Sequence, residues 1–339
     1  MITTQVAFLF PGQGSQAVGM GADVFAASPA AKQVFATFDQ TLGFALSELC
    51  FAGPEETLRS TINAQPAIVA VSLAYLAAFQ EALSSSYSSW SIPFTPAYVA
   101  GHSVGECSAL VAAGAVGLSG VAQLVRERGR LMHEEELACP GGMAAVIGLD
   151  EGVLQEICQE VIQGLQASDV RHPGQGQVII ANYNAPGQIV LSGEQQALEA
   201  ALQIAKERGA KKVIPLAVSG AFHSPVMAPA VAQMAHSLSV TAIQNPQIPL
   251  IGNITATPLT SVEELREELA QQVASSVQWT RTIEYLVSQG VTTFFEIGPG
   301  KALAGMNKRI AKGATTINIS SVAEIEKAVE LVREMGLVQ

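Results

Sequence analysis

Gly101-His102-Ser103-Val104-Gly105 directly follows an apolar run at residues 97–100, and a helical pattern of small residues comes after it. A strand that feeds such a Gly-x-Ser-x-Gly turn, with a helix behind it, exposes the serine as a nucleophile. The glycines suit a sharp bend, because a side chain two residues before or after the serine would crowd the turn. The pentapeptide alone also fits an ordinary turn that happens to contain serine, so its surroundings must decide.

Strands alternate with helices on both sides of this turn, which predicts an α/β fold. The expected strands lie at 5–10, 97–100, 248–251, 293–297 and 315–320, and the expected helices lie at 28–38, 54–62, 67–83, 262–275, 280–288 and 302–310. Pro66 is expected to open the helix at 67–83, since proline is favoured in the first helical turn. Together with the serine turn, this order favours an α/β-hydrolase-like large domain.

A second unit is predicted between the two halves of the first. Strands at 143–149, 177–182, 188–193 and 212–216 and helices at 154–165 and 195–208 follow the order β-α-β-β-α-β, which is the ferredoxin-like unit. We therefore expect a discontinuous large domain, residues 1–137 and 217–339, and an inserted small domain, residues 138–216. A cleft between them is the expected site.

Composition narrows the class of protein. The chain has 339 residues, of which 49% are hydrophobic and 14% charged, and a net charge of -11. Such acidity argues against a nucleic-acid partner. No apolar stretch approaches a membrane span, and no signal peptide is recognisable at the start, so we expect a soluble, cytoplasmic protein. The four cysteines lack metal-site or disulfide spacing, which favours buried free thiols and no bound metal.

A nucleophilic serine needs a base, and histidine serves best at neutral pH. Among five histidines, His223 follows a strand end where the chain returns from the inserted unit, so it is the candidate, although a core histidine fits equally well. No acidic residue near it in sequence stands out as a third triad member. A backbone carbonyl can orient the imidazole instead, so a Ser-His dyad is chemically sufficient.

Two other features allow rival interpretations. The pattern Gly-x-Gly-x-x-Ala at residues 12–17 fits a dinucleotide fingerprint, but the following segment is helical where a second strand ending in an acidic residue is required. The glycines are better explained by backbone amides approaching an oxyanion. Arg128 is one of three arginines at 126–130, which by themselves indicate a solvated helix face; turned inward, it could bind a carboxylate through two parallel hydrogen bonds.

Several motifs, taken in order, resemble one family over nearly the whole chain. They are Phe10-Pro11-Gly12-Gln13-Gly14-Ser15-Gln16, Gln65-Pro66-Ala67, Gly101-His102-Ser103-Val104-Gly105-Glu106, Arg128-Gly129, Asn184-Ala185-Pro186-Gly187-Gln188, Gly220-Ala221-Phe222-His223-Ser224 and Glu296-Ile297-Gly298-Pro299-Gly300. The chain resembles the malonyl-CoA:acyl carrier protein transacylases and the acyltransferase domains of polyketide synthases.

The resemblance implies roles for individual residues. Ser103 is the expected nucleophile, His223 its base, and the main-chain carbonyl of Gln278 the group that orients the histidine. The backbone amides of Gln13 and Val104 are the implied oxyanion hole. The implied substrate-binding residues are Arg128, for the malonyl carboxylate, together with Gln65, Asn184, Gln188 and Phe222, of which Phe222 would crowd a 2-methyl branch.

The implied reaction moves malonyl from malonyl-CoA to the phosphopantetheine thiol of acyl carrier protein, through a malonyl-Ser103 intermediate in a ping-pong mechanism. The implied partners are CoA and the carrier protein, without a tightly bound cofactor, and the chain is expected to be a monomer. Fatty acid and polyketide synthesis fit equally well. The alternative is an acyl hydrolase acting on carrier-protein thioesters, and Arg128 argues against it, because a hydrolase of varied acyl groups has no use for a carboxylate-binding cation.

Overall fold

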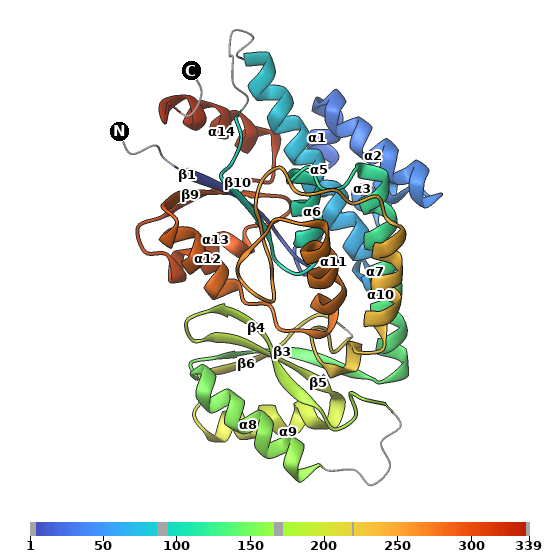
Figure 1. Cartoon of the computed structure of the whole chain (residues 1–339), viewed down its shortest axis with the longest axis vertical. Helices are drawn as coiled ribbons and strands as arrows, with labels where there is room; N and C mark the ends of the chain where they lie inside the picture. The colour runs from blue at the N-terminus through green and yellow to red at the C-terminus, as the bar shows by residue number, and fades with distance from the viewer. Residues whose placement is uncertain (1–4, 87–93, 166–171, 219, 337–339) are drawn as a thin grey trace.

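A mostly parallel six-stranded sheet forms the centre of the larger part of the molecule (Figure 1). The computed structural model describes residues 5–86, 94–165, 172–218 and 220–336. The strand order is β10-β9-β1-β2-β7-β8, in which only the β7–β8 pair is antiparallel. The strands are β1 (Gln5–Phe10), β2 (Tyr98–Gly101), β7 (Leu250–Ile251), β8 (Pro258–Leu259), β9 (Val291–Ile297) and β10 (Thr315–Ile319). The predicted α/β class is confirmed.

Helices cover both faces of this sheet, as the side chains of β1 show, because successive residues of the strand point to opposite faces. Phe8 and Phe10 join the large core with α2, α5, α6, α7, α10 and α14, whereas Ala7 and Leu9 pack with α12 and α13. The bounds are α1 (Ala22–Ala27), α2 (Pro29–Leu42), α3 (Leu46–Ala52), α4 (Glu55–Arg59), α5 (Thr61–Ser86), α6 (Gly105–Ala112), α7 (Leu118–Ala138), α10 (Ala230–Val240), α11 (Val262–Gln271), α12 (Trp279–Ser288), α13 (Ala302–Ile310) and α14 (Val322–Glu334). Both faces of the sheet are therefore buried, as parallel sheets require.

Helix α5 corrects two expectations. The segment Thr61–Ser85 contains an 18-residue window with a mean hydropathy of 1.6 and is long and apolar enough to cross a membrane, so the expectation that no stretch approaches a span was wrong. The most apolar window of the helix is 72% buried, because α5 is a core helix packed between α2 and α7.

The start of α5 was also placed wrongly, because the helix begins five residues before Pro66. Proline has no N–H to donate to the carbonyl four residues earlier, here that of Ile62. Arg126 of α7 supplies the missing donor, with its Nη1 atom 2.7 Å from the Ile62 oxygen and 2.7 Å from Asn63 Oδ1. A side chain from another helix thus allows Pro66 to lie inside α5.

The second sheet is antiparallel, in the order β4-β5-β3-β6, and is formed by β3 (Gly141–Ile147), β4 (Val178–Ala185), β5 (Gln188–Glu194) and β6 (Lys212–Pro215). Helices α8 (Glu151–Gly164) and α9 (Gln195–Glu207) share a separate core with this sheet. The order β-α-β-β-α-β with this strand arrangement is the predicted ferredoxin-like unit, at the lower end of Figure 1. The domain boundaries after residues 137 and 216 stay predictions.

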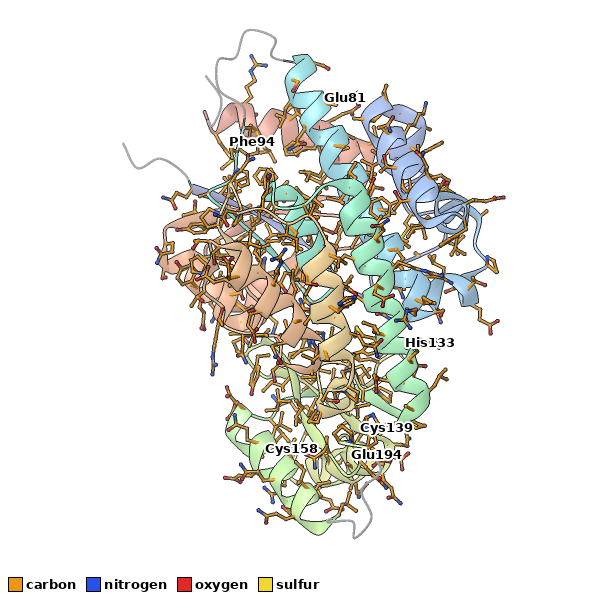
Figure 2. The ribbon with its side chains drawn as sticks, turned by 45° about the vertical axis from the view of Figure 1, so that its right-hand side comes forward. Glu81, Phe94, His133, Cys139, Cys158 and Glu194 are labelled. Atoms are coloured by element: carbon orange, nitrogen blue, oxygen red, sulfur yellow. The ribbon has the colours of Figure 1, made fainter. Side chains whose placement is uncertain are left out.

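All four cysteines are free and buried, as expected. Figure 2 shows Cys158 on α8 and Cys139 near Glu194, where α7 gives way to the small sheet. Burial raises the pKa of the Cys158 thiol to about 12 and that of Cys107 to about 11. These thiols are protonated at neutral pH, so they act as small apolar side chains.

Candidate active site

Ser103 lies at a sharp turn between β2 and α6, the strand-turn-helix context that its sequence predicts. Its φ of 52° is in the left-handed region, where a residue other than glycine is strained. A Cβ atom on Gly101 would lie 2.0 Å from the carbonyl carbon of Gly105, and one on Gly105 would lie 2.2 Å from the Phe10 oxygen. Only glycine fits at these two positions, so the pentapeptide has the strained strand-turn-helix geometry predicted for a nucleophile elbow.

His223 contacts the serine directly. Its Nε2 atom lies 2.7 Å from Ser103 Oγ, and its Nδ1 atom lies 2.8 Å from the carbonyl oxygen of Gln272 and 3.1 Å from that of Ser275. Carbonyl oxygens only accept hydrogen bonds, so Nδ1 carries the proton and Nε2 is free to accept the serine hydroxyl. Burial, with the nearby Arg128 charge, lowers the pKa of His223 to about 3. A neutral imidazole is thus available as a base at pH 7.

The structure corrects the residue that orients this histidine. The Gln278 carbonyl accepts from the N–H of Thr282 at 2.9 Å, in the first turn of α12, and does not face the imidazole. The 3-10 turn η2 (Gln272–Ala274) instead directs the Gln272 and Ser275 carbonyls at His223. The idea of a main-chain carbonyl holds, but the assignment to Gln278 was wrong.

Arg128 points inward from α7 and is only 2% exposed. Its Nη1 atom lies 2.6 Å from Gln65 Oε1, and its Nη2 atom lies 2.6 Å from Gln272 Oε1 and 3.3 Å from Ser103 Oγ. No carboxylate of the described residues forms an ion pair with it, because its direct partners are neutral oxygens. A buried cation beside the Ser103 hydroxyl is suited to bind an anionic group of a substrate.

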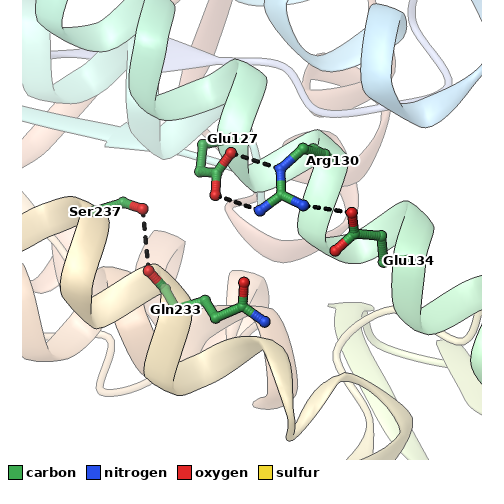
Figure 3. Close-up of polar contacts among 5 residues, drawn as sticks. All are labelled: Glu127, Arg130, Glu134, Gln233 and Ser237. Carbon is green, nitrogen blue, oxygen red and sulfur yellow. Dashed lines mark hydrogen bonds and ion pairs between the residues drawn. The ribbon is translucent and has the colours of Figure 1, made fainter.

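Arg130, two residues further along α7, lies on a solvated helix face, which is the other interpretation that the sequence allowed. It forms ion pairs with Glu127, at 2.6 Å, and with Glu134 on the outer side of the helix (Figure 3). The solvated-face interpretation is therefore correct for Arg130 and wrong for Arg128. Helical geometry separates them, because positions two apart lie on nearly opposite sides of a helix.

A cavity of about 270 Å³ opens at Ser103 and His223, between the two sheets. Its lining includes the implied site residues Gln13, Asn184, Gln188 and Phe222, with Met143, Ala145 and Val190 from the small sheet and Ala302, Leu303 and Met306 from α13. Arg128 and Gln65 do not line it, and Arg128 lies beside it through its contact with Ser103 Oγ. A cavity is thus present where the cleft is expected.

Other implied residues have partners of their own. Asn184 Oδ1 lies 2.8 Å from His102 Nε2, and Gln188 Oε1 accepts from Arg309 Nη1 at 2.8 Å. Among the described residues, no backbone acceptor bonds to the N–H groups of Gln13 or Val104, although Val104 directly precedes α6. A helix N-terminus favours negative charge, so these two donors stay the predicted oxyanion hole.

Two residues that contact Ser103 were not predicted from the sequence. Asn253 accepts from the Ser103 N–H at 2.7 Å through Oδ1 and donates to the Gly101 carbonyl at 2.7 Å through Nδ2. Its place just after an expected strand could have signalled it, because the carboxyl ends of parallel strands meet at the site. Gln272 gave no signal, since it fell inside the helix expected at 262–275.

Within the part of the chain that the structure describes, no cluster of three or more His, Cys, Asp and Glu side chains is arranged to hold a metal ion.

The chain is similar to known proteins along nearly its whole length. Residues 7–330 match the family model described as "Acyl transferase domain". The malonyl CoA-acyl carrier protein transacylase of Bacillus subtilis is 41% identical over 332 residues, which are 98% of each chain. The enzyme of the same name from Escherichia coli K12 is 37% identical over 328 residues, covering 97% of this chain and all of that one.

Solved structures are similar throughout. The acyl-carrier-protein S-malonyltransferase from Bartonella henselae has a TM-score of 0.88 and 40% identity, covering 98% of this chain and 100% of that one. A malonyl-transacylase in complex with its type II polyketide synthase acyl-carrier protein has a TM-score of 0.88 and 38% identity, covering 97% and 100%.

Proposed function

Because the chain belongs to the malonyl CoA-acyl carrier protein transacylase family, we propose that it transfers malonyl from malonyl-CoA to acyl carrier protein through a malonyl-Ser103 intermediate. One observation carries the proposal: Ser103 Oγ is 2.7 Å from the base His223 and 3.3 Å from the buried cation Arg128. The first contact serves acyl transfer, and the second selects an acyl group that bears a carboxylate.

The first half-reaction forms the acyl-enzyme. His223 Nε2 takes the hydroxyl proton while Ser103 Oγ attacks the thioester carbon of malonyl-CoA. The N–H groups of Gln13 and Val104 stabilise the oxyanion of the tetrahedral intermediate. When the C–S bond breaks, the proton on His223 passes to the sulfur, so CoA leaves as a thiol.

The second half-reaction reverses these roles. The phosphopantetheine thiol of the carrier protein gives its proton to His223, and its sulfur attacks the ester carbonyl on Ser103. The C–O bond breaks, and His223 returns the proton to Ser103 Oγ. The same base and oxyanion hole serve both halves, as expected for a ping-pong transferase.

Substrate selection belongs to the surrounding groups. Arg128 binds the malonyl carboxylate, with Gln65 holding one side of its guanidinium. Asn184 and Gln188 lie along the cavity, where the thioester and pantetheine pass, and Phe222 limits substitution at C2. One methyl group changes specificity by only about 1 to 3 kcal/mol, so we expect a preference for malonyl over methylmalonyl.

The test is a transfer assay with malonyl-, methylmalonyl- and acetyl-CoA, each with and without carrier protein bearing its phosphopantetheine. We expect malonyl to move to the carrier, with little free malonate when the carrier is absent. Release of malonate at the same rate with or without carrier would favour the acyl hydrolase. The reaction needs no tightly bound cofactor, and the monomeric state and cytoplasmic location stay predictions.

A further inference from the structure

Glu106, the last residue of the serine motif, is fully buried on α6 and takes no part in the proposed chemistry. Its two oxygens face two different loops. Oε2 accepts from Gln272 Nε2, and Oε1 accepts from the backbone N–H of Asn253 at 3.2 Å. Both loops reach the active site, because Gln272 contacts Arg128 and Asn253 holds the Ser103 N–H.

The contacts of Gln272 fix which way its amide points. Oε1 faces Arg128 Nη2 at 2.6 Å, while Nε2 faces the Ser103 carbonyl at 3.1 Å and the Glu106 carboxyl. A flipped amide would place N–H groups against the N–H groups of Arg128 and an oxygen against two acceptors. Glu106 and the Ser103 carbonyl therefore both favour the orientation in which Gln272 offers an oxygen to Arg128.

Arg128 depends on this oxygen for its position. Its guanidinium is held between Gln65 and Gln272, on opposite sides, and neither partner is charged. Glu106 lies one residue further away, behind Gln272, so it occupies no guanidinium N–H. A direct ion pair would instead compete with the substrate carboxylate for the same donors.

A second buried carboxyl, Glu268, lies beside Glu106 but does not contact Gln272. It accepts from the N–H of Ile254 at 2.7 Å. Burial and the neighbouring Glu268 raise the pKa of Glu106.

From these contacts we propose that Glu106 is a positioning residue for malonyl selectivity, which acts through Gln272 to hold Arg128 ready for the substrate carboxylate. The inference rests on the proposed function, since it assigns to Glu106 the orientation of the cation that selects malonyl. Glu106 touches neither the substrate nor the reacting atoms. Its loss is thus expected to change which acyl group is preferred more than the chemistry itself.

The test compares kcat/KM for malonyl-CoA and acetyl-CoA in Glu106→Met, a variant of similar length whose thioether sulfur is only a weak acceptor. General damage to the elbow affects both substrates and cancels in their ratio. The malonyl to acetyl ratio is expected to fall about 10-fold or more, mainly through KM for malonyl-CoA, the size expected for one hydrogen bond to a charged group. Glu268→Gln is the matched control and should keep the wild-type ratio.

A double variant separates positioning from a structural role. If Glu106 acts through Arg128, then Glu106→Met should not change the ratio further in an Arg128→Ala background. An unchanged ratio in Glu106→Met, an equal fall in Glu268→Gln, or full additivity with Arg128→Ala would each overturn the inference. If Glu106→Met does not fold, Glu106→Asp draws the carboxylate back by one methylene and must also lower the ratio. Failure of the wild-type protein to transfer malonyl would instead reject the proposed function.

Discussion

Replacing Arg128 by alanine removes the cation next to Ser103 and should separate malonyl from acetyl transfer. A guanidinium can give a carboxylate two parallel hydrogen bonds, and each bond to a charged group is worth about 1.5 to 3 kcal/mol. Loss of both corresponds to about 3 to 6 kcal/mol, or roughly 10² to 10⁴ in kcat/KM for malonyl-CoA. Acetyl-CoA has no carboxylate, so its kcat/KM should stay equal or rise.

Stability must be measured beside the kinetics. Arg128→Ala leaves the Gln65 and Gln272 side-chain oxygens without their donor, which costs about 1 to 3 kcal/mol for each buried group. Both substrates are therefore assayed well below the thermal midpoint of the variant. Arg130→Ala, on the outer side of the same helix, is the matched control and should change neither substrate. An equal loss for malonyl and acetyl transfer in Arg128→Ala would refute the role of Arg128.

Three further outcomes are expected. The low pKa of His223, about 3, keeps the imidazole neutral and active as pH falls. We therefore expect kcat/KM for acylation by malonyl-CoA to stay flat between about pH 5 and 7. A fall in kcat/KM with an apparent pKa near 6.5 would contradict this. Phe222→Ala should improve methylmalonyl-CoA relative to malonyl-CoA about 10-fold, measured as the ratio of kcat/KM, and an unchanged ratio would exclude Phe222 as the barrier. Arg126→Ala should lower the free energy of unfolding by about 1 to 3 kcal/mol in urea denaturation. The reason is that the Ile62 carbonyl loses the donor that stands in for the N–H group Pro66 lacks. An unchanged free energy of unfolding would show that this hydrogen bond is dispensable.

Much of the fold follows from local patterns in the sequence. The order β-α-β-β-α-β of the small unit was readable because each strand and helix there is short, periodic and separated by turn residues. The start of α5 was not readable. Pro66 is tolerated inside the helix only because Arg126 reaches it from α7, and no local pattern reports a donor sixty residues away.

Some features of the site could likewise be predicted from the sequence, and others could not. The elbow could be predicted because its two crowded positions require glycine, which is visible in the sequence. The inward Arg128 could be predicted because it belongs to a motif of the family. The carbonyl that orients His223 could not, because every residue has one and only the turn η2 decides that Gln272 and Ser275 point at the imidazole. Backbone contacts carry no residue signature, which is why Gln278 was chosen wrongly.

The acyl-enzyme is the claim on which the mechanism depends. It is tested by mixing the protein with malonyl-CoA without carrier protein, quenching in acid, and locating the added mass by peptide mass spectrometry. We expect one malonyl group on Ser103, none in Ser103→Ala, and its loss when carrier protein with its phosphopantetheine is added before the quench. Full malonyl transfer by Ser103→Ala, or a malonyl group on another residue that the carrier removes, would contradict the account.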